Sequence, residues 1–210
     1  AFVAGSCPNA GTYTNTWTVA DDCGNTSTVF TQVITITDNT APTWTTVAGA
    51  LNVSIDCSDA AGLAAAQALF PVASDNCDGD VTNLIKVSGA FVVGACPQAG
   101  TYTNTWTVAD DCGNTSTVFT QVITITDFTA PILTPPATQT LNVGAGNLCR
   151  VNMPDYRGLV GVVDCSTTTL EQLAPNAPGS LVIGYGGSRT IVIKATDACG
   201  NSSTTSFLVL

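Results

Sequence analysis

The stretch TYTNTWTV occurs twice in this chain, at residues 12–19 and at residues 101–108. It alternates threonine with larger side chains. Because successive side chains of a β-strand point to opposite faces, such a strand would place Tyr13, Trp17 and Val19 on one face and threonines on the other. The stretch therefore predicts, in each copy, a β-strand with one apolar face and one solvated face.

A hairpin is predicted around each copy. Residues 20–25 are rich in Asp, Asn and Gly, which favour turns, and residues 29–37 form a second β-branched run. Two strands joined by such a turn pair in antiparallel fashion. We expect Trp17 and its copy Trp106 to lie in a core beneath the hairpin.

The hairpin belongs to a longer tandem repeat. Residues 1–42 reappear as residues 90–131 with four differences, which gives a register of 89 residues. One catalytic site suffices for an enzyme, whereas a chain that must be long gains reach with every copy. The repeat therefore favours a structural or adhesive role.

Three domains are predicted from this register. Residues 1–42 are interpreted as the C-terminal part of a truncated repeat, residues 43–131 as a complete repeat and residues 132–210 as a divergent one. Short β-branched runs separated by turn signals are typical of an all-β, immunoglobulin-like sandwich. The alanine-rich residues 59–69 predict one short helix in the complete repeat. We expect the sandwiches to be arranged end to end in tandem.

Composition excludes several classes of function. Fifteen acidic against five basic residues give a net charge of −10, which repels phosphate backbones and anionic lipid headgroups. The chain has no histidine, so neither a Ser-His-Asp nor a Cys-His catalytic centre can be assembled. Its longest helix-like stretch, residues 60–70, is about half as long as a membrane-spanning helix. A non-enzymatic protein without membrane insertion or nucleic-acid partners is predicted.

The cysteines indicate an oxidising location. There are nine of them, and no two stand in a Cys-x-x-Cys pair of the kind that binds zinc. Structural disulfides persist in extracellular compartments. Since no basic region followed by an apolar stretch opens the chain, we interpret it as an internal piece of a longer exported protein.

Strand geometry limits how the cysteines can pair. An extended strand separates Cys7 from Cys23 by roughly 50 Å, whereas bonded cysteines need Cα atoms within about 7 Å, and the same argument separates Cys96 from Cys112. Cys7 and Cys23 are expected to bond to an earlier part of the protein, and Cys149 to be a free thiol. Assigning the other cysteines to the two poles of a sandwich predicts the disulfides Cys57–Cys96, Cys77–Cys112 and Cys165–Cys199.

Clustered aspartates predict a calcium site at each domain junction. Calcium takes six to eight oxygen ligands, and the cation relieves the repulsion between carboxylates. The competing interpretation is that Asp, Asn and Gly only turn the chain through local hydrogen bonds, and both interpretations remain open at this point. The candidate ligands are Asp38, Asp75, Asp78, Asp80, Asp110, Asp111, Asp127, Asp164 and Asp197.

Three motifs carry a family resemblance. They are the linker Thr-Asp-x-Thr-Ala-Pro at residues 37–42 and 126–131, the turn Asp-x-Cys-Gly-Asn-x-Ser, and Met153-Pro154-Asp155-Tyr156. Together they resemble the HYR-type immunoglobulin-like repeats of giant surface adhesins of gliding Bacteroidetes, the SprB-type gliding adhesins. The resemblance implies secretion through the outer membrane, display on long surface filaments, and adhesion to surfaces or polysaccharide.

These observations predict the stalk of a secreted cell-surface adhesin filament, which spaces and displays adhesive regions in gliding motility. The expected partners are neighbouring repeats of the same chain, surface polysaccharide and other cell-surface proteins. The alternative is that the repeats are themselves multivalent polysaccharide-binding modules, because near-identical copies suit multivalent binding as well as spacing.

Overall fold

The computed structural model describes residues 1–142, 150–183 and 187–210. Over these residues the chain is mostly β-sheet, with the helix α1 (Ala60–Gln67) and the 3-10 turn η1 (Arg157–Leu159), so the predicted all-β sandwich class is confirmed. The chain divides into two compact units. The first comprises residues 1–52, 68–90 and 102–122, and the second residues 53–67, 91–101 and 123–210. The three predicted domains stay a prediction.

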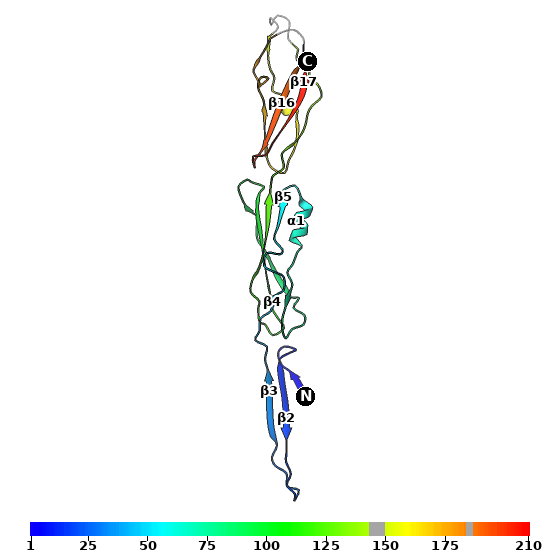
Figure 1. Ribbon diagram of the computed structural model, residues 1–210, viewed down its shortest axis with the longest axis vertical. Coiled ribbons are helices and arrows are strands. Elements are labelled where there is room, and N and C mark those ends of the chain that lie inside the picture. Colours follow the sequence, from blue (N-terminus) through cyan, green and yellow to red (C-terminus); the bar gives the residue numbers. More distant parts are fainter. Residues whose placement is uncertain (143–149, 184–186) are drawn as a thin grey trace. The chain divides into compact units, whose positions relative to one another are not determined.

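The first unit opens with the predicted hairpin. Strand β2 (Gly11–Trp17) pairs antiparallel with β3 (Phe30–Ile36), and β1 (Phe2–Ala4) pairs with the other edge of β2. Figure 1 shows β2 and β3 side by side, running in opposite directions. The alternating pattern thus predicted the strands correctly. It did not predict their burial, because Trp17 is 50% exposed and the expectation of a core position for it is wrong.

The second copy of the hairpin lies in β9 (Gly100–Val108) and β10 (Phe119–Thr126), both of which run through the two units. In the first unit β7 (Leu84–Ser88) pairs with β9, and β4 (Thr43–Trp44) pairs with β6 (Ala73–Ser74). Trp106 is 2% exposed, with its ring centroid 6.1 Å from that of Phe119, so its predicted core position is confirmed. Asn104 and Gln121 are also fully buried on this face, and the Asn104 amide donates a 3.0 Å hydrogen bond to Gln121.

In the second unit, β5 (Val53–Asp56) pairs in parallel with the end of β10, and β8 (Val92–Val93) pairs with the start of β9. Helix α1 follows β5 and lies beside it (Figure 1). The helix begins where the Asp59 carboxylate accepts a 2.7 Å hydrogen bond from the Gly62 amide, which satisfies a free N–H of the first turn. This is the short helix that the alanine-rich stretch predicted.

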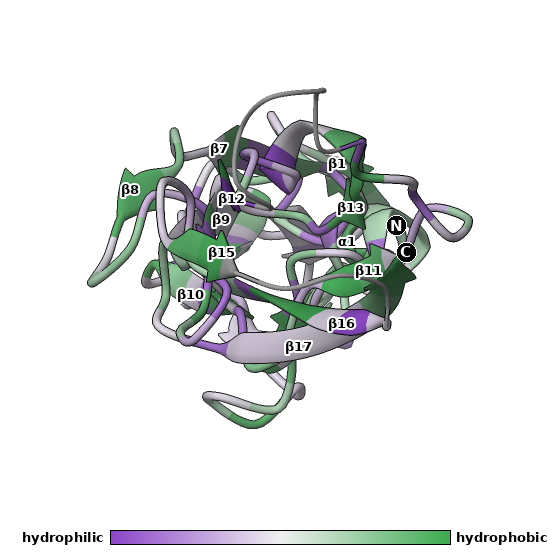
Figure 2. Ribbon diagram, turned by 90° about the horizontal axis from the view of Figure 1, so that it is seen from above, coloured by the Kyte–Doolittle hydropathy of each residue, from purple (hydrophilic) through white to green (hydrophobic). Residues whose placement is uncertain are grey.

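The rest of the second unit forms small antiparallel sheets. Strands β14 (Thr168–Gln172), β16 (Arg189–Asp197) and β17 (Ser202–Val209) make one sheet in that order. Strand β11 (Ile132–Thr134) pairs with β13 (Gly161–Val163), and β12 (Arg150–Asn152) pairs with β15 (Leu181–Ile183). Figure 2 colours β11 and β15 as hydrophobic, whereas β17, which consists largely of Ser and Thr, is close to neutral.

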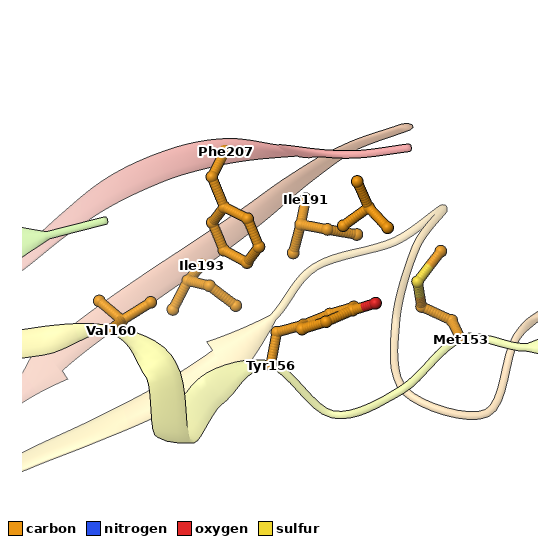
Figure 3. Close-up of a cluster of buried hydrophobic side chains, with 7 residues drawn as sticks. Met153, Tyr156, Val160, Ile191, Ile193 and Phe207 are labelled. Carbon is orange, nitrogen blue, oxygen red and sulfur yellow. The ribbon is translucent and has the colours of Figure 1, made fainter. Parts of the chain in front are cut away.

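The core of this part gathers around Tyr156. Figure 3 shows Phe207 of β17 and Ile191 and Ile193 of β16 facing Tyr156 and Met153. The ring centroids of Tyr156 and Phe207 are 5.7 Å apart with an edge-on geometry. Met153 and Tyr156 of the motif at residues 153–156 therefore pack in this core.

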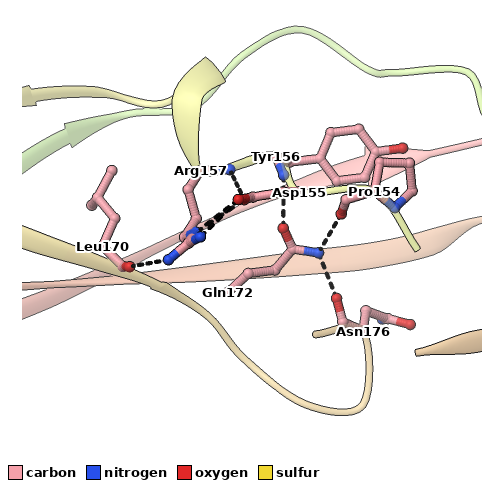
Figure 4. A network of polar contacts seen from close by, with 7 residues as sticks. All are labelled: Pro154, Asp155, Tyr156, Arg157, Leu170, Gln172 and Asn176. Carbon is pink, nitrogen blue, oxygen red and sulfur yellow. Dashed lines mark hydrogen bonds and ion pairs between the residues drawn. The ribbon is translucent and has the colours of Figure 1, made fainter. Parts of the chain in front are cut away.

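Polar side chains form a hydrogen-bond network around the motif at residues 153–156 (Figure 4). The Gln172 side chain accepts a 2.8 Å hydrogen bond from the Tyr156 amide and donates to the carbonyls of Pro154 and Asn176. Asp155 forms an ion pair of 2.7 Å with Arg157. Within the described residues, no helix is long and apolar enough to cross a membrane.

Candidate functional site

Three disulfides are formed among the described residues, and each joins cysteines from two different predicted domains. Their Cα–Cα distances are 5.0, 5.9 and 5.2 Å. The predicted pairs Cys57–Cys96, Cys77–Cys112 and Cys165–Cys199 are therefore wrong, as is the expectation that Cys7 bonds outside this chain. The pairs that form are Cys7–Cys112, Cys57–Cys165 and Cys96–Cys199.

Two of the disulfides are copies of one another. Cys7 and Cys96 correspond in the 89-residue register, and Cys112 and Cys199 occupy the same place in two Asp-x-Cys-Gly-Asn turns. The cystines close loops with sequence separations of 105 and 103 residues. The cysteine before the first strand of a hairpin thus bonds to the turn of the next repeat, and the link recurs at each junction.

The turn that carries the second cysteine is held by its own aspartate. Asp110 Oδ1 accepts hydrogen bonds from the amides of Cys112 (2.9 Å) and Asn114 (2.8 Å), and Oδ2 accepts from the Asn114 side chain at 2.8 Å. Burial opposes ionisation of Asp110, but the bonds from Asn114 and the turn amides lower its pKa. Gly113 has φ of 91°, a backbone conformation that suits glycine.

Asp197 repeats this arrangement in the second unit. It accepts from the amides of Cys199 (2.9 Å) and Asn201 (2.8 Å) and from the Asn201 side chain (2.9 Å). For Asp110 and Asp197, the interpretation as turn-forming residues accounts for the observed bonds. Both oxygens of each carboxylate accept hydrogen bonds within the turn.

The side chains of Asn114 and Asn201 also form hydrogen bonds between the turn and the linker. The Asn114 side chain donates to the Asp38 carbonyl at 3.2 Å, and the Asn201 side chain donates to the Asp127 carbonyl at 3.1 Å. Asp38 and Asp127 correspond in the register. Each junction is therefore closed twice, by a disulfide and by an Asn-to-linker hydrogen bond.

The candidate metal-ligating groups lie around the linker aspartates Asp38 and Asp127. In the first unit, ligand atoms of Asp38, Asp75 and Cys77 lie within 4.8 Å of one another. In the second unit, Asp127, Asp164 and Cys165 form the matching group. Asp56 and Cys57 also lie within 4.8 Å of Cys165, and Asp56 is a residue that the sequence prediction missed. Its pKa is lowered, chiefly by hydrogen bonds from Ser58.

Two carboxylate oxygens in these groups are buried without a hydrogen-bond partner in the described structure: Oδ2 of Asp75 and Oδ2 of Asp127. Asp127 is only 5% exposed. A buried carboxylate oxygen with no donor is costly because nothing replaces the water that it has lost. A cation at this position would supply the missing interaction.

The remaining candidate ligands lie elsewhere in the first unit. Asp78 is buried, but its carboxylate accepts hydrogen bonds from the amides of Asp80 and Asp111, both at 3.0 Å. Asp80 and Asp111 are exposed. Of the carboxylates predicted to converge at the first junction, the structure brings together Asp38 and Asp75.

Two cysteines are unpaired among the described residues, Cys23 and Cys77. Cys23 is exposed in the first hairpin, at the position that corresponds to Cys112. Burial raises the pKa of the Cys77 thiol, as do the carboxylates of Asp38, Asp75 and Asp110. The prediction for Cys149 falls outside the described residues.

Comparison with known proteins does not assign the chain to a family. No protein-family model matches the chain, and no curated protein matches it. Among solved structures, protocadherin gamma C5 EC1-3 is 12% identical over 97% of this chain and 78% of that one, with a TM-score of 0.37. The human desmocollin-1 ectodomain is 14% identical over 94% of this chain and 46% of that one (TM-score 0.32). Human protocadherin-24 EC1-2 is 18% identical over 81% and 97% (TM-score 0.31).

Proposed function

We propose that this chain is a stalk segment of a large secreted surface adhesin, non-enzymatic, whose repeats space and display adhesive regions. The observation that carries the proposal is that every disulfide among the described residues joins two different predicted repeats. A catalytic domain has no need to be bonded to its neighbour, whereas a chain that transmits force gains from such links.

The disulfides shorten the covalent path between the two ends. Pulled from its termini, the oxidised chain carries tension through residues 1–7, then residues 112–96, then residues 199–210, because the Cys7–Cys112 and Cys96–Cys199 bonds bypass the rest. At full stretch this path spans roughly 120 Å, against roughly 700 Å for the reduced chain. On the chain-entropy model, closing a loop of this length also stabilises the fold by about 4.7 kcal/mol.

The proposed setting is extracellular, because disulfides of this kind need an oxidising compartment. The resemblance of the linker and turn motifs to SprB-type repeats supports a place in the adhesive filaments of a gliding bacterium. Neighbouring repeats of the same chain are the first partners, and surface polysaccharide or other cell-surface proteins are the proposed targets of the displayed regions.

Force spectroscopy on the 210-residue chain tests the mechanical part of the proposal. Held by both ends under oxidising conditions, the chain should extend by no more than its short covalent path, and reduction should release most of the full contour length. If the oxidised and reduced chains release the same length, the disulfides carry no tension and the stalk proposal fails.

We also propose that calcium binds beside the linker aspartates, at Asp127 and Asp164 and at the equivalent Asp38 and Asp75. The support is the buried, unpartnered Oδ2 of Asp127, which lies within a group of oxygen and sulfur atoms no more than 4.8 Å apart. Carboxylate oxygens are the ligands that calcium prefers, and further ligands would come from backbone carbonyls or water. Cys165 is in a disulfide, so it is not a thiolate ligand.

A further inference from the structure

One apolar sheet face of the first unit is uncovered. Among the described residues β3 is hydrogen-bonded to β2 alone, so its other edge is free. The large apolar side chains on this face of the β2–β3 hairpin are exposed: Tyr13 by 40%, Trp17 by 50%, Phe30 by 67%, Ile34 by 43% and Ile36 by 39%. Monomeric soluble proteins rarely expose a contiguous apolar patch of this kind without a partner for it.

The same sequence is buried where it occurs a second time. The residues equivalent to Trp17, Phe30, Ile34 and Ile36 are Trp106 (2% exposed), Phe119 (4%), Ile123 (0%) and Ile125 (7%). Since these positions carry identical residues, the difference in burial comes from what packs against them. The segments that contact the second hairpin therefore indicate what kind of segment would pair with the first.

A segment that begins at residue 51 pairs with the outer edge of β10. The Gln121 side chain donates to the Leu51 carbonyl and the Val122 amide donates to the Asn52 side chain, both at 2.8 Å. Strand β5 then runs parallel to β10 with Ile123 opposite Val53 and Thr126 opposite Asp56. The equivalent positions on the free edge of β3 and just beyond it are residues 34–37.

The cysteine after β5 gives a second, independent indication that a β5-type strand would pair with β3. The Cys57 amide donates to the Thr126 carbonyl at 2.8 Å, and Cys57 is bonded to Cys165, whose sulfur lies beside Asp127. In the first unit, the unpaired Cys77 has its sulfur beside Asp38, the counterpart of Asp127. A β5-type strand added to β3 would therefore deliver its cysteine to Cys77.

We propose that β3 accepts, in parallel, a strand of the same type as residues 50–69, and that the cysteine of that segment bonds to Cys77. The segment would come from another repeat of this kind, and it would extend the β2–β3 sheet at its free edge as β5 extends the sheet of β9 and β10. The proposal concerns how repeats are joined and holds whether or not the chain is an adhesin.

The bond forms by thiol–disulfide exchange. A peptide of residues 50–69 carries its cysteine as a mixed disulfide with glutathione. The Cys77 thiolate attacks the peptide sulfur, the new S–S bond forms as the peptide–glutathione bond breaks, and glutathione leaves as the thiolate. The exchange is electron-neutral, so it needs no further oxidant.

The experiment adds this peptide to the intact 210-residue chain at mildly alkaline pH and identifies the crosslinked cysteine by mass spectrometry. The expected product joins the peptide to Cys77, with slower amide hydrogen exchange at residues 33–37 as the added strand pairs with the edge of β3. A Cys77→Ser variant should lose the product, and a Cys23→Ser variant should keep it.

The matched control is a peptide of the same composition with its residues scrambled around the cysteine. If the scrambled peptide crosslinks as fast, or if Cys23 reacts as readily as Cys77, simple thiol accessibility explains the result and the proposal is overturned. A crosslink to Cys77 without slower amide exchange at residues 33–37 would equally overturn it, because the strand would not have paired with β3.

Discussion

The aspartates at the junctions differ in their hydrogen bonds. Asp110 and Asp197 have each carboxylate oxygen engaged within the turn, whereas Oδ2 of Asp127 is buried without a donor in the described part of the chain. The sequence could predict that aspartates gather at junctions. It could not predict which of them are already satisfied, because that depends on hydrogen bonds formed only when the turn closes.

The calcium proposal is tested by replacing Asp127. We expect calcium to raise the melting temperature of the chelator-treated chain, and Asp127→Asn to weaken that response and the heat of binding, because the amide removes a negative charge from the group. Asp80→Asn is the matched control, since Asp80 is exposed and outside the group. Calorimetric titration measures both variants. No heat and no thermal shift with the unmodified chain would end the proposal.

A second residue-scale prediction concerns acid. Hydrogen bonds from Arg157 lower the pKa of Asp155 from 3.8 to about 2. Because the folded-state pKa is the lower one, the stabilisation by the ionised carboxylate is complete above about pH 4 and is lost as the pH falls towards 2. Carboxyl titration by NMR should find the low pKa, and Arg157→Gln should return it towards 3.8. An unchanged titration in that variant would contradict the assigned cause.

At the level of secondary structure, two copies of one hairpin allow a matched comparison. Trp106 is 2% exposed and Trp17 is 50% exposed in the same local sequence. We expect Trp106→Ala to lower the free energy of unfolding by about 3–5 kcal/mol, as for other buried aromatic residues. Trp17→Ala should cost less than about 1 kcal/mol in the isolated chain. Chemical denaturation measures both, and equal losses would show that the first hairpin is covered after all.

The hairpin also shows what an alternating pattern can and cannot predict. The β-branched runs located β2, β3, β9 and β10, and the alternation identified the apolar face of β2 and β9. Burial of that face depends on residues distant in sequence. In the second copy Trp44 packs against Phe119 with ring centroids 5.5 Å apart, whereas Phe30 in the first copy is 67% exposed. Local sequence fixes the conformation of a strand, whereas a partner that is distant in sequence decides whether its apolar face meets water.

Disulfide pairing belongs to the scale of the whole molecule. Strand length correctly separated Cys7 from Cys23 and Cys96 from Cys112. The predicted pairs are wrong because each joins two cysteines of one sandwich, whereas the turn of one repeat is bonded to the preceding repeat. The 89-residue register held a usable signal, since Cys7 and Cys96 are equivalent and so are the turns of Cys112 and Cys199.

The central claim is that consecutive repeats are bonded to one another, and non-reducing peptide mapping tests it most directly. The chain is digested with its thiols blocked, and linked peptides are identified by mass spectrometry before and after reduction. We predict fragments joined through Cys7–Cys112, Cys57–Cys165 and Cys96–Cys199. Fragments joined through Cys57–Cys96, Cys77–Cys112 or Cys165–Cys199 would place the disulfides within single repeats and contradict the account.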